Sequence, residues 1–158
     1  MLFKDCLCLQ VGRVARKMSK ITRKKLASYG LTTTQFFLLT ALYEGDGVPI
    51  SVLAQKVALD KATLTGLLDR LERDDFIERK ADPDDRRAIR IFLTPKAESL
   101  RVELTELYHQ NNGMFLSILT SEESEIFERV VDKLEKADFG RDSIPTSKSG
   151  QERGLNAP

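Results

Sequence analysis

Residues 51–73 read SVLAQKVALDKATLTGLLDRLER and hold two short amphipathic patterns joined by a tight turn. The first pattern has the small Ala54 where two helices would cross closely, and the second presents Leu64 and Leu67 towards the first. Asp60 stands directly before the second pattern, where a helix needs an N-cap. These features are typical of a helix-turn-helix, although the segment alone also fits an ordinary helical hairpin with a solvated outer face.

The ends and the outer face of this helix pair give further expectations. We expect Ser51 to cap the first helix. The turn carries Ala58 and Leu59 instead of the glycine that is common there, which weakens the motif. Short polar and basic side chains at the start of a helix suit the base edges and phosphates of a DNA major groove. The outward-facing side chains of this kind are Lys61, Thr63, Thr65 and Arg70.

Two strand patterns follow within residues 76–93 and are joined by the charged loop DPDDRR of residues 82–87. A hairpin directly after a helix-turn-helix would place this loop near a minor groove, whose negative potential attracts inserted arginine. Arg86 and Arg87 are therefore candidate minor-groove contacts. We expect Asp85 to pair bidentately with the Arg87 guanidinium and so fix its direction. Taken alone, the loop also fits a solvated turn nucleated by Asp-Pro.

Apolar periodicity predicts helices on both sides of this segment, so we expect a mainly α fold with a small β-hairpin wing. The first expected helix is basic and amphipathic, and the second is apolar. Thr94 and Pro95 have the order of an N-cap and a first helical residue. The expected helices run from Leu7 to about Tyr29, from an N-cap within Thr32-Thr33-Thr34 through Leu42, from a Thr94 cap to about Leu119, and from a Ser121 cap to Leu134.

Charge is distributed unevenly along the 158 residues, although the net charge is only +1. Residues 1–30 carry eight basic groups and one acid, whereas residues 98–139 carry ten acids and four basic groups. Opposite blocks of this kind indicate that different faces meet different partners. The expected organisation is a winged helix-turn-helix DNA-binding domain at 31–93, a helical dimerisation region at 1–30 and 94–139, and a flexible tail at 140–158.

Composition excludes several classes of protein. No apolar run approaches the ~18 residues of a membrane span, and Lys4 and Asp5 do not fit a signal peptide, so we expect a cytoplasmic protein without a membrane partner. Cys6 and Cys8 make no disulfide framework. An enzyme is not expected, and neither is a cofactor or a metal, because the sequence lacks a glycine-rich phosphate loop, a histidine-centred nucleophile set and a metal motif. The single histidine, His109, is expected at the surface or an interface.

In order and spacing, residues 5–139 resemble the MarR family of bacterial winged-helix regulators. The resemblance is carried by the helix pair quoted above, by DPDDRR at 82–87 and by LTP at 93–95. It implies a homodimer in which the first and the last two helices interlock. The second helix of the pair would enter the major groove of double-stranded DNA, and a wing arginine the minor groove. It also implies phosphate contacts at the helix N-termini near Thr33 and Ser51.

Apolar residues near both ends of the chain exceed what so small a winged helix needs for its own core. We expect them to form a two-fold interface, around which the basic residues of 1–30 pair with the acids of 98–139; an intramolecular helical cap is the alternative. A symmetric dimer predicts a pseudo-palindromic operator with half-sites about 10–10.5 bp apart, or a multiple of that spacing. The residues concerned are Leu2, Phe3, Leu7, Leu9, Phe115, Leu119, Ile126, Val130 and Leu134.

The resemblance further implies that a small aromatic or anionic effector releases the DNA by binding between the dimerisation helices and the winged helix. Candidate pocket residues are Val11, Arg16, Phe36 and Phe37, and the Arg16 guanidinium could meet a carboxylate. Basic residues on such a helix are more often solvated or paired, which is the alternative for Arg16.

Cys8 raises a redox hypothesis, because the hydroperoxide-sensing branch of the MarR family keeps its reactive cysteine on the first helix. Residues 59–65 also resemble that branch, but its sulfur-holding tyrosines are replaced here by Thr22 and Thr33, and a cysteine among leucines is usually an inert small hydrophobe. Three hypotheses stay open at this stage. The first hypothesis is a DNA-binding repressor released by an effector. The second is a thiol-based peroxide-sensing regulator acting through Cys8, and the third is a winged-helix protein-interaction module without DNA binding.

Overall fold

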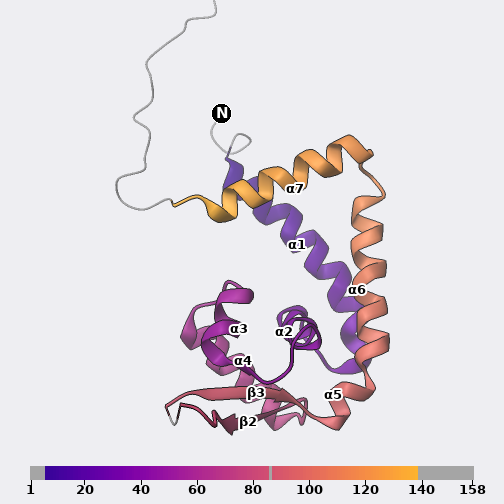
Figure 1. Ribbon diagram of the computed structural model, residues 1–158. Helices are drawn as coiled ribbons and strands as arrows, with labels where there is room; N and C mark the ends of the chain where they lie inside the picture. The colour runs from indigo at the N-terminus through magenta and orange to yellow at the C-terminus, as the bar shows by residue number, and fades with distance from the viewer. Residues whose placement is uncertain (1–5, 86, 139–158) are drawn as a thin grey trace, which may run out of the picture. The chain divides into compact units, whose positions relative to one another are not determined.

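The computed structural model describes residues 6–85 and 87–138, and the chain divides into two units, Met1–Leu116 and Ser117–Pro158 (Figure 1). The first unit contains six of the seven α-helices found in the described residues and a three-stranded sheet. The second unit contains one helix. The elements are α1 (Leu7–Leu26), a 3₁₀ turn (Ala27–Tyr29), α2 (Thr33–Tyr43), β1 (Val48–Pro49), α3 (Ile50–Lys56), α4 (Lys61–Arg73), β2 (Ile77–Ala81), β3 (Ile89–Leu93), α5 (Pro95–Ser99), α6 (Arg101–Leu116) and α7 (Ser121–Lys136).

Side-chain caps set the starts of four helices. The Asp60 and Thr94 caps are confirmed at α4 and α5, and Thr32 closes a capping box with Gln35 at α2. The Ser121 cap is wrong by one residue, because the Thr120 hydroxyl and Glu123 carboxylate form the reciprocal pair that a capping box requires.

The Ser51 cap is also wrong, since Ser51 lies inside α3. Pro49 precedes this helix in an extended conformation, with ψ 145°, and pairs with Arg90 in the sheet. The chain therefore passes directly from strand to helix at Ile50, and no side chain caps α3.

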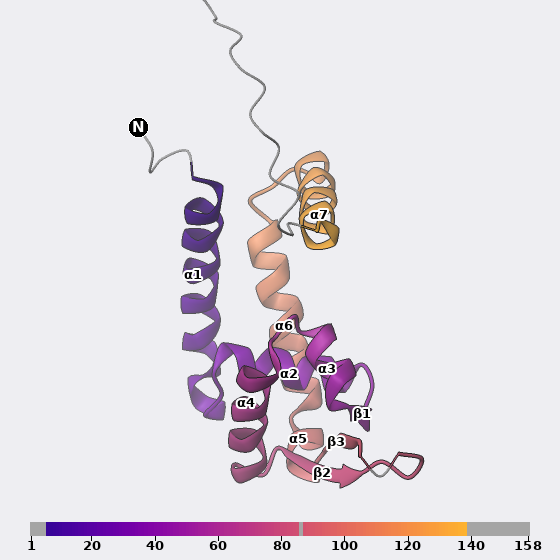
Figure 2. The same ribbon diagram turned by 90° about the vertical axis from the view of Figure 1, so that its left-hand side faces the viewer.

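The sheet is antiparallel in the order β1-β3-β2, and the β2–β3 hairpin confirms the predicted wing (Figure 2). Strand β1 was not predicted, because two residues are too few to show a period. Gly47 makes this pairing possible. Its φ is +67°, and a Cβ there would meet Phe92 Cε1 of β3 at 2.7 Å.

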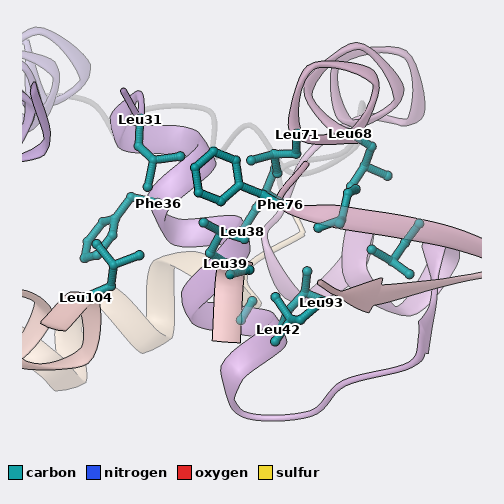
Figure 3. Close-up of a cluster of buried hydrophobic side chains, with 14 of the residues drawn as sticks. Leu31, Phe36, Leu38, Leu39, Leu42, Leu68, Leu71, Phe76, Leu93 and Leu104 are labelled. Carbon is teal, nitrogen blue, oxygen red and sulfur yellow. The ribbon is translucent and has the colours of Figure 1, made fainter. Parts of the chain in front are cut away.

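Helix α2 supplies much of the buried core, because apolar residues occupy most of its sides. Figure 3 shows Phe36 of α2 beside Leu104 of α6, and Phe76 beside Leu71 of α4. The sheet contributes Ile77, Ile91 and Leu93 to the same cluster. This core holds the α4 helix and the wing on one framework, which fixes where their exposed side chains lie.

The helix predicted from Thr94 to about Leu119 is interrupted at Leu100, and its second part ends at Leu116. The Leu100 amide donates to the Ala97 carbonyl at 3.2 Å, a tighter turn than an α-helix makes. Arg101 stabilises the break, because its guanidinium binds Glu98 and also donates to the Tyr43 carbonyl at 2.7 Å. The predictions for Leu2, Phe3 and the tail 140–158 lie outside the described residues.

Candidate nucleic-acid interface

The turn between α3 and α4 is made by Ala58, which takes the left-handed conformation with φ 50°. The Leu59 amide donates to the Ala54 carbonyl at 3.1 Å and closes this turn. Alanine thus adopts the backbone conformation that usually selects glycine, at some cost in conformational energy. The absence of a turn glycine therefore did not prevent the helix-turn-helix.

The N-terminus of α4 is ordered by its own polar side chains. Asp60 accepts from the Thr63 amide at 2.9 Å and from the Thr63 hydroxyl at 2.6 Å, and the hydroxyl bond chiefly lowers the pKa of Asp60. The Thr65 hydroxyl donates to the Lys61 carbonyl at 2.8 Å. Both threonine protons are therefore engaged, so each hydroxyl can offer a ligand only its acceptor lone pairs and the adjacent methyl group. Such groups suit a base amino group or a thymine methyl.

The outward face of α4 carries all four predicted side chains, Lys61, Thr63, Thr65 and Arg70, in exposed positions. The sequence interpretation missed Gly66, which is exposed on the same helix and has nothing within 4 Å of where a Cβ would be. A glycine inside a helix lowers its stability by about 1 kcal/mol relative to alanine, so its presence in a predicted helix could have marked Gly66 as a position with a special role. Without a side chain, this turn of α4 permits close approach to its backbone.

The root of the wing is held by Asp82, a buried carboxylate whose role the sequence interpretation missed. One of its oxygens accepts from the Asp84 and Asp85 amides at 2.9 and 3.3 Å, and the other accepts from Arg90 Nε at 2.6 Å. The Asp84 amide is the main reason that the pKa of Asp82 is lowered. Arg90 also donates to the Gly47 carbonyl at 3.0 Å, which ties the wing to the segment before β1.

The predicted pairing of Asp85 with the Arg87 guanidinium is not present among the described residues. The Asp85 carboxylate instead accepts from the Arg87 backbone amide at 2.9 Å, in a short turn that uses it locally. Arg87 itself is exposed. Arg86 lies outside the described residues.

A concave site of about 580 Å³ lies between the start of α3, the start of α4 and the root of the wing. It brings together three predicted residues, Ser51, Lys61 and Arg87, above an apolar floor. Thr33 is not part of it, because Thr33 begins α2 and its hydroxyl donates to the Ser19 carbonyl at 3.4 Å. The lining residues are Pro49, Ile50, Ser51, Ala54, Lys61, Arg87, Ala88 and Ile89.

The predicted effector residues do not line one cavity in the part of the chain that the structure describes. Phe36 is a core residue, 1% exposed, and its ring packs at a tilt against that of Phe37, with ring centroids 5.5 Å apart. Val11 and Phe37 are about half exposed. Arg16 lines a shallow hollow of about 510 Å³ whose lining residues, Gln10, Arg13, Val14, Arg16 and Lys17, all belong to α1.

Cys6 and Cys8 are both exposed free thiols, and exposure is one condition for thiol reactivity. The Thr22 hydroxyl donates to the Met18 carbonyl within α1, and the Thr33 hydroxyl donates from α2 to the Ser19 carbonyl of α1, so both hydroxyl protons are engaged with backbone. Peroxide sensing through Cys8 stays a prediction. Within residues 6–85 and 87–138, no three His, Cys, Asp or Glu residues are grouped as a metal site, and no helix there has the length and apolarity to cross a bilayer.

The terminal helices expose apolar faces. The first half of α1 leaves Leu7, Val11 and Val14 more than half exposed. In α7, which is described by itself, no residue is buried, although its apolar residues fall on one face. Those residues are Ile126, Phe127, Val130, Val131 and Leu134.

The family model described as MarR family matches residues 31–89, the segment from α2 to the wing. The HTH-type transcriptional regulator YsmB of Bacillus subtilis (strain 168) is 39% identical over 114 residues, which cover 72% of this chain and 77% of YsmB. The HTH-type transcriptional regulator TtmR of Methylorubrum extorquens (strain PA1) is 35% identical over 108 residues, 68% of this chain. The match spans only 55% of the length of TtmR.

Solved structures share the fold. The Staphylococcus aureus MepR–DNA complex superposes with a TM-score of 0.76 at 25% identity, over 82% of this chain and 96% of that chain. Bordetella bronchiseptica BpsR, whose DNA binding is regulated by 6-hydroxynicotinic acid, superposes with a TM-score of 0.79 at 24% identity, over 87% and 99% of the two chains. The β-hairpin and helix-turn-helix described above thus occur together in a protein solved on DNA.

Proposed function

Since the chain belongs to the MarR family of transcriptional regulators, which are not enzymes, we propose that it represses transcription as a homodimer bound to a pseudo-palindromic DNA operator. The observation that carries this proposal is the concave site between α3, α4 and the wing, which Lys61 and Arg87 both line. Basic side chains from a helix and from a hairpin that line one site suit binding to a DNA duplex, because phosphates flank both grooves of the duplex.

In this proposal α4 lies in the major groove, and the wing reaches the adjacent minor groove. Thr63 and Thr65 face base edges as acceptors and methyl groups, while Lys61 and Arg70 meet guanine or phosphate. Arg87, with Arg86, enters the minor groove, and the Asp82 and Asp85 contacts hold the loop that presents Arg87. Ser51 and Thr33 meet phosphates near the starts of their helices.

The proposed homodimer is supported by the exposed apolar faces of α1 and α7, which a second copy would cover. It is also supported by charge, because α1 is basic and α7 carries six acids against three basic residues. A two-fold dimer would space its two α4 helices to match half-sites about 10–10.5 bp apart, or a multiple of that spacing.

We further propose that a small aromatic or anionic effector releases the DNA, and that the protein works in the cytoplasm, where bacterial DNA lies. The regulation of BpsR by 6-hydroxynicotinic acid supports this effector class, and Arg16, Val11 and Phe37 are exposed on α1 and α2 to meet it. A ligand that binds the DNA-free arrangement more tightly than the DNA-bound one would shift the equilibrium towards release.

The direct experiment is selection of genomic DNA fragments by the purified chain at physiological salt. We expect enrichment of a short inverted repeat, with a footprint consistent with two copies of the chain. If no fragment is retained above the non-specific level, the winged-helix protein-interaction hypothesis replaces this one.

A further inference from the structure

The side chain of Arg79 in β2 contacts three residues of α4 that span about two helical turns. Its Nη2 atom lies 2.8 Å from Asp69 Oδ1, and its Nη1 atom lies 2.6 Å from Glu72 Oε2. Nη2 also reaches the Thr65 carbonyl at 3.5 Å. Thr65, Asp69 and Glu72 are spaced by four and three residues, so they form one face of α4.

Glu72 also binds the Arg79 backbone. The other carboxylate oxygen of Glu72 accepts from the Arg79 amide at 3.2 Å. Since β2 is an edge strand in the order β1-β3-β2, this amide has no partner strand, and Glu72 supplies one. Side-chain and backbone contacts together fasten α4 to the first strand of the wing hairpin.

The contact differs from an isolated surface ion pair. A planar guanidinium that binds two carboxylates in fixed directions constrains geometry as well as charge, and a lysine in its place would reach only as a point charge. The Arg79 side chain is 23% exposed, less than most of the paired side chains in the described residues. Thr65, whose carbonyl Arg79 approaches, is among the side chains proposed to face base edges.

We propose that Arg79, with Asp69 and Glu72, is a positioning residue that keeps α4 in register with the wing, so that one half-site is read by both elements. This inference rests on the proposed function. Arg79 then contributes to operator recognition without touching DNA. Loosening it costs specific binding, because α4 and the wing must fit two grooves at once, while non-specific backbone binding has no such requirement.

The test measures binding to the selected operator and to an unrelated duplex of equal length across a salt series. Arg79→Lys keeps the charge and loses the fork, and Glu72→Gln removes an acid from a helix that faces phosphate. We expect both to weaken operator binding about tenfold, to leave non-specific binding unchanged, and to leave the salt slope unchanged. Lys80→Ala is the matched control, because Lys80 is the next residue of β2 and pairs with Glu78, away from α4; we expect an affinity within about twofold of wild type.

Several results would overturn the positioning role. Tighter operator binding by Glu72→Gln would mean that the acid only repels phosphate, and wild-type binding by Arg79→Lys would mean that charge alone matters. A salt slope lowered by about one in Arg79→Ala would make Arg79 a phosphate contact. Loss of cooperative thermal unfolding in both Arg79→Lys and Glu72→Gln would make the contact a requirement for folding. If the wild-type chain selects no operator, the proposed function fails first, and the role assigned to Arg79 falls with it.

Discussion

The winged helix and the terminal helices differ in how many of their side chains find partners within the chain. In the winged helix, Asp60, Asp82 and Arg79 each make two or more polar contacts within the chain. In α1, by contrast, none of the seven basic side chains forms an ion pair anywhere in residues 6–85 and 87–138. The apolar faces of α1 and α7 are exposed as well.

This difference separates a surface that is ordered before it binds from one that needs a partner. A framework already held in place loses little further freedom when the side chains it carries meet a ligand, so the winged helix is suited to a rigid target with a fixed shape. Exposed apolar stripes instead lower their free energy when another molecule covers them.

The largest effect is expected at α7. Val130→Lys places a charge in the centre of its exposed apolar face and should dissociate the dimer, because an unpaired charge is costly to bury at an interface. Light scattering should report a shift to the 17.9 kDa mass of one chain, and operator binding should fall about a hundredfold as two-site binding is lost.

Glu125→Lys is the matched control for this prediction, since it introduces the same side chain on α7 at an exposed position outside the apolar set. It should remain dimeric. Dissociation of both variants, or of neither, would contradict the assignment of the apolar face as the interface.

The next effect concerns the wing. Arg87→Ala should weaken operator binding by about tenfold to a hundredfold, because it removes a charged contact proposed for the minor groove. The dimer mass and thermal unfolding should not change, since Arg87 is exposed and, within residues 6–85 and 87–138, hydrogen-bonds through its backbone amide, to Asp85, and not through its guanidinium. Arg73→Ala removes an equal charge from the end of α4 and serves as the comparison; equal losses in the two variants would argue for bulk charge instead of a wing contact.

A smaller effect, dependent on pH, is expected at Asp82. Its pKa is lowered in the folded chain, chiefly by the Asp84 amide, so the carboxylate stabilises the fold fully above its unfolded pKa of about 3.9. That contribution is lost as pH falls through the lower folded-state pKa. Asp82→Asn should therefore be less stable than wild type at neutral pH, and urea denaturation should show this gap shrinking below about pH 4. A gap that widens in acid would contradict the sign of the shift.

Local signals in the sequence predicted the parts of the molecule that depend on neighbouring residues. Asp60 and Thr94 cap the helices that follow them, because a cap acts over three residues. The wing, the apolar stripe of α4 and the exposure of its polar face were predicted for the same reason. The Ser121 cap failed only because Thr120 offers a better match to Glu123.

Contacts between distant segments could not be predicted in this way. Strand β1 exists because Gly47 lets it approach Phe92, forty-five positions away, and Arg90 donates to the Gly47 carbonyl from forty-three positions away. Phe36 and Phe37 follow each other in sequence, but Phe36 is buried in the core, with its ring centroid 6.5 Å from that of Tyr108 in α6, whereas Phe37 is about half exposed. In the wing loop, the sequence does not distinguish Asp82, Asp84 and Asp85 as the acid that orders the arginines. The structure shows that Asp82, the buried one of the three, holds the loop.

The smallest effect is expected at the turn of the helix-turn-helix. Ala58 has φ 50°, a conformation that costs a residue with a Cβ about 1 kcal/mol, whereas glycine adopts it freely. Glycine also has more freedom to lose on folding, which offsets part of the gain. Ala58→Gly should therefore raise the free energy of unfolding by about 0.5 kcal/mol, measured by urea denaturation, and leave operator affinity unchanged.

Ala62→Gly makes the same substitution four residues later, inside α4, where it should lower the free energy of unfolding by about 0.5 kcal/mol. Opposite signs in the two variants would show that the turn is held left-handed against the preference of its residue. Equal destabilisation would mean that Ala58 carries no strain. The expected result would mean that the contacts around Ala58 impose a conformation that alanine itself disfavours. These contacts include the Asp60 cap and the hydrogen bond from the Leu59 amide to the Ala54 carbonyl. No such constraint is expected for the exposed faces of α1 and α7.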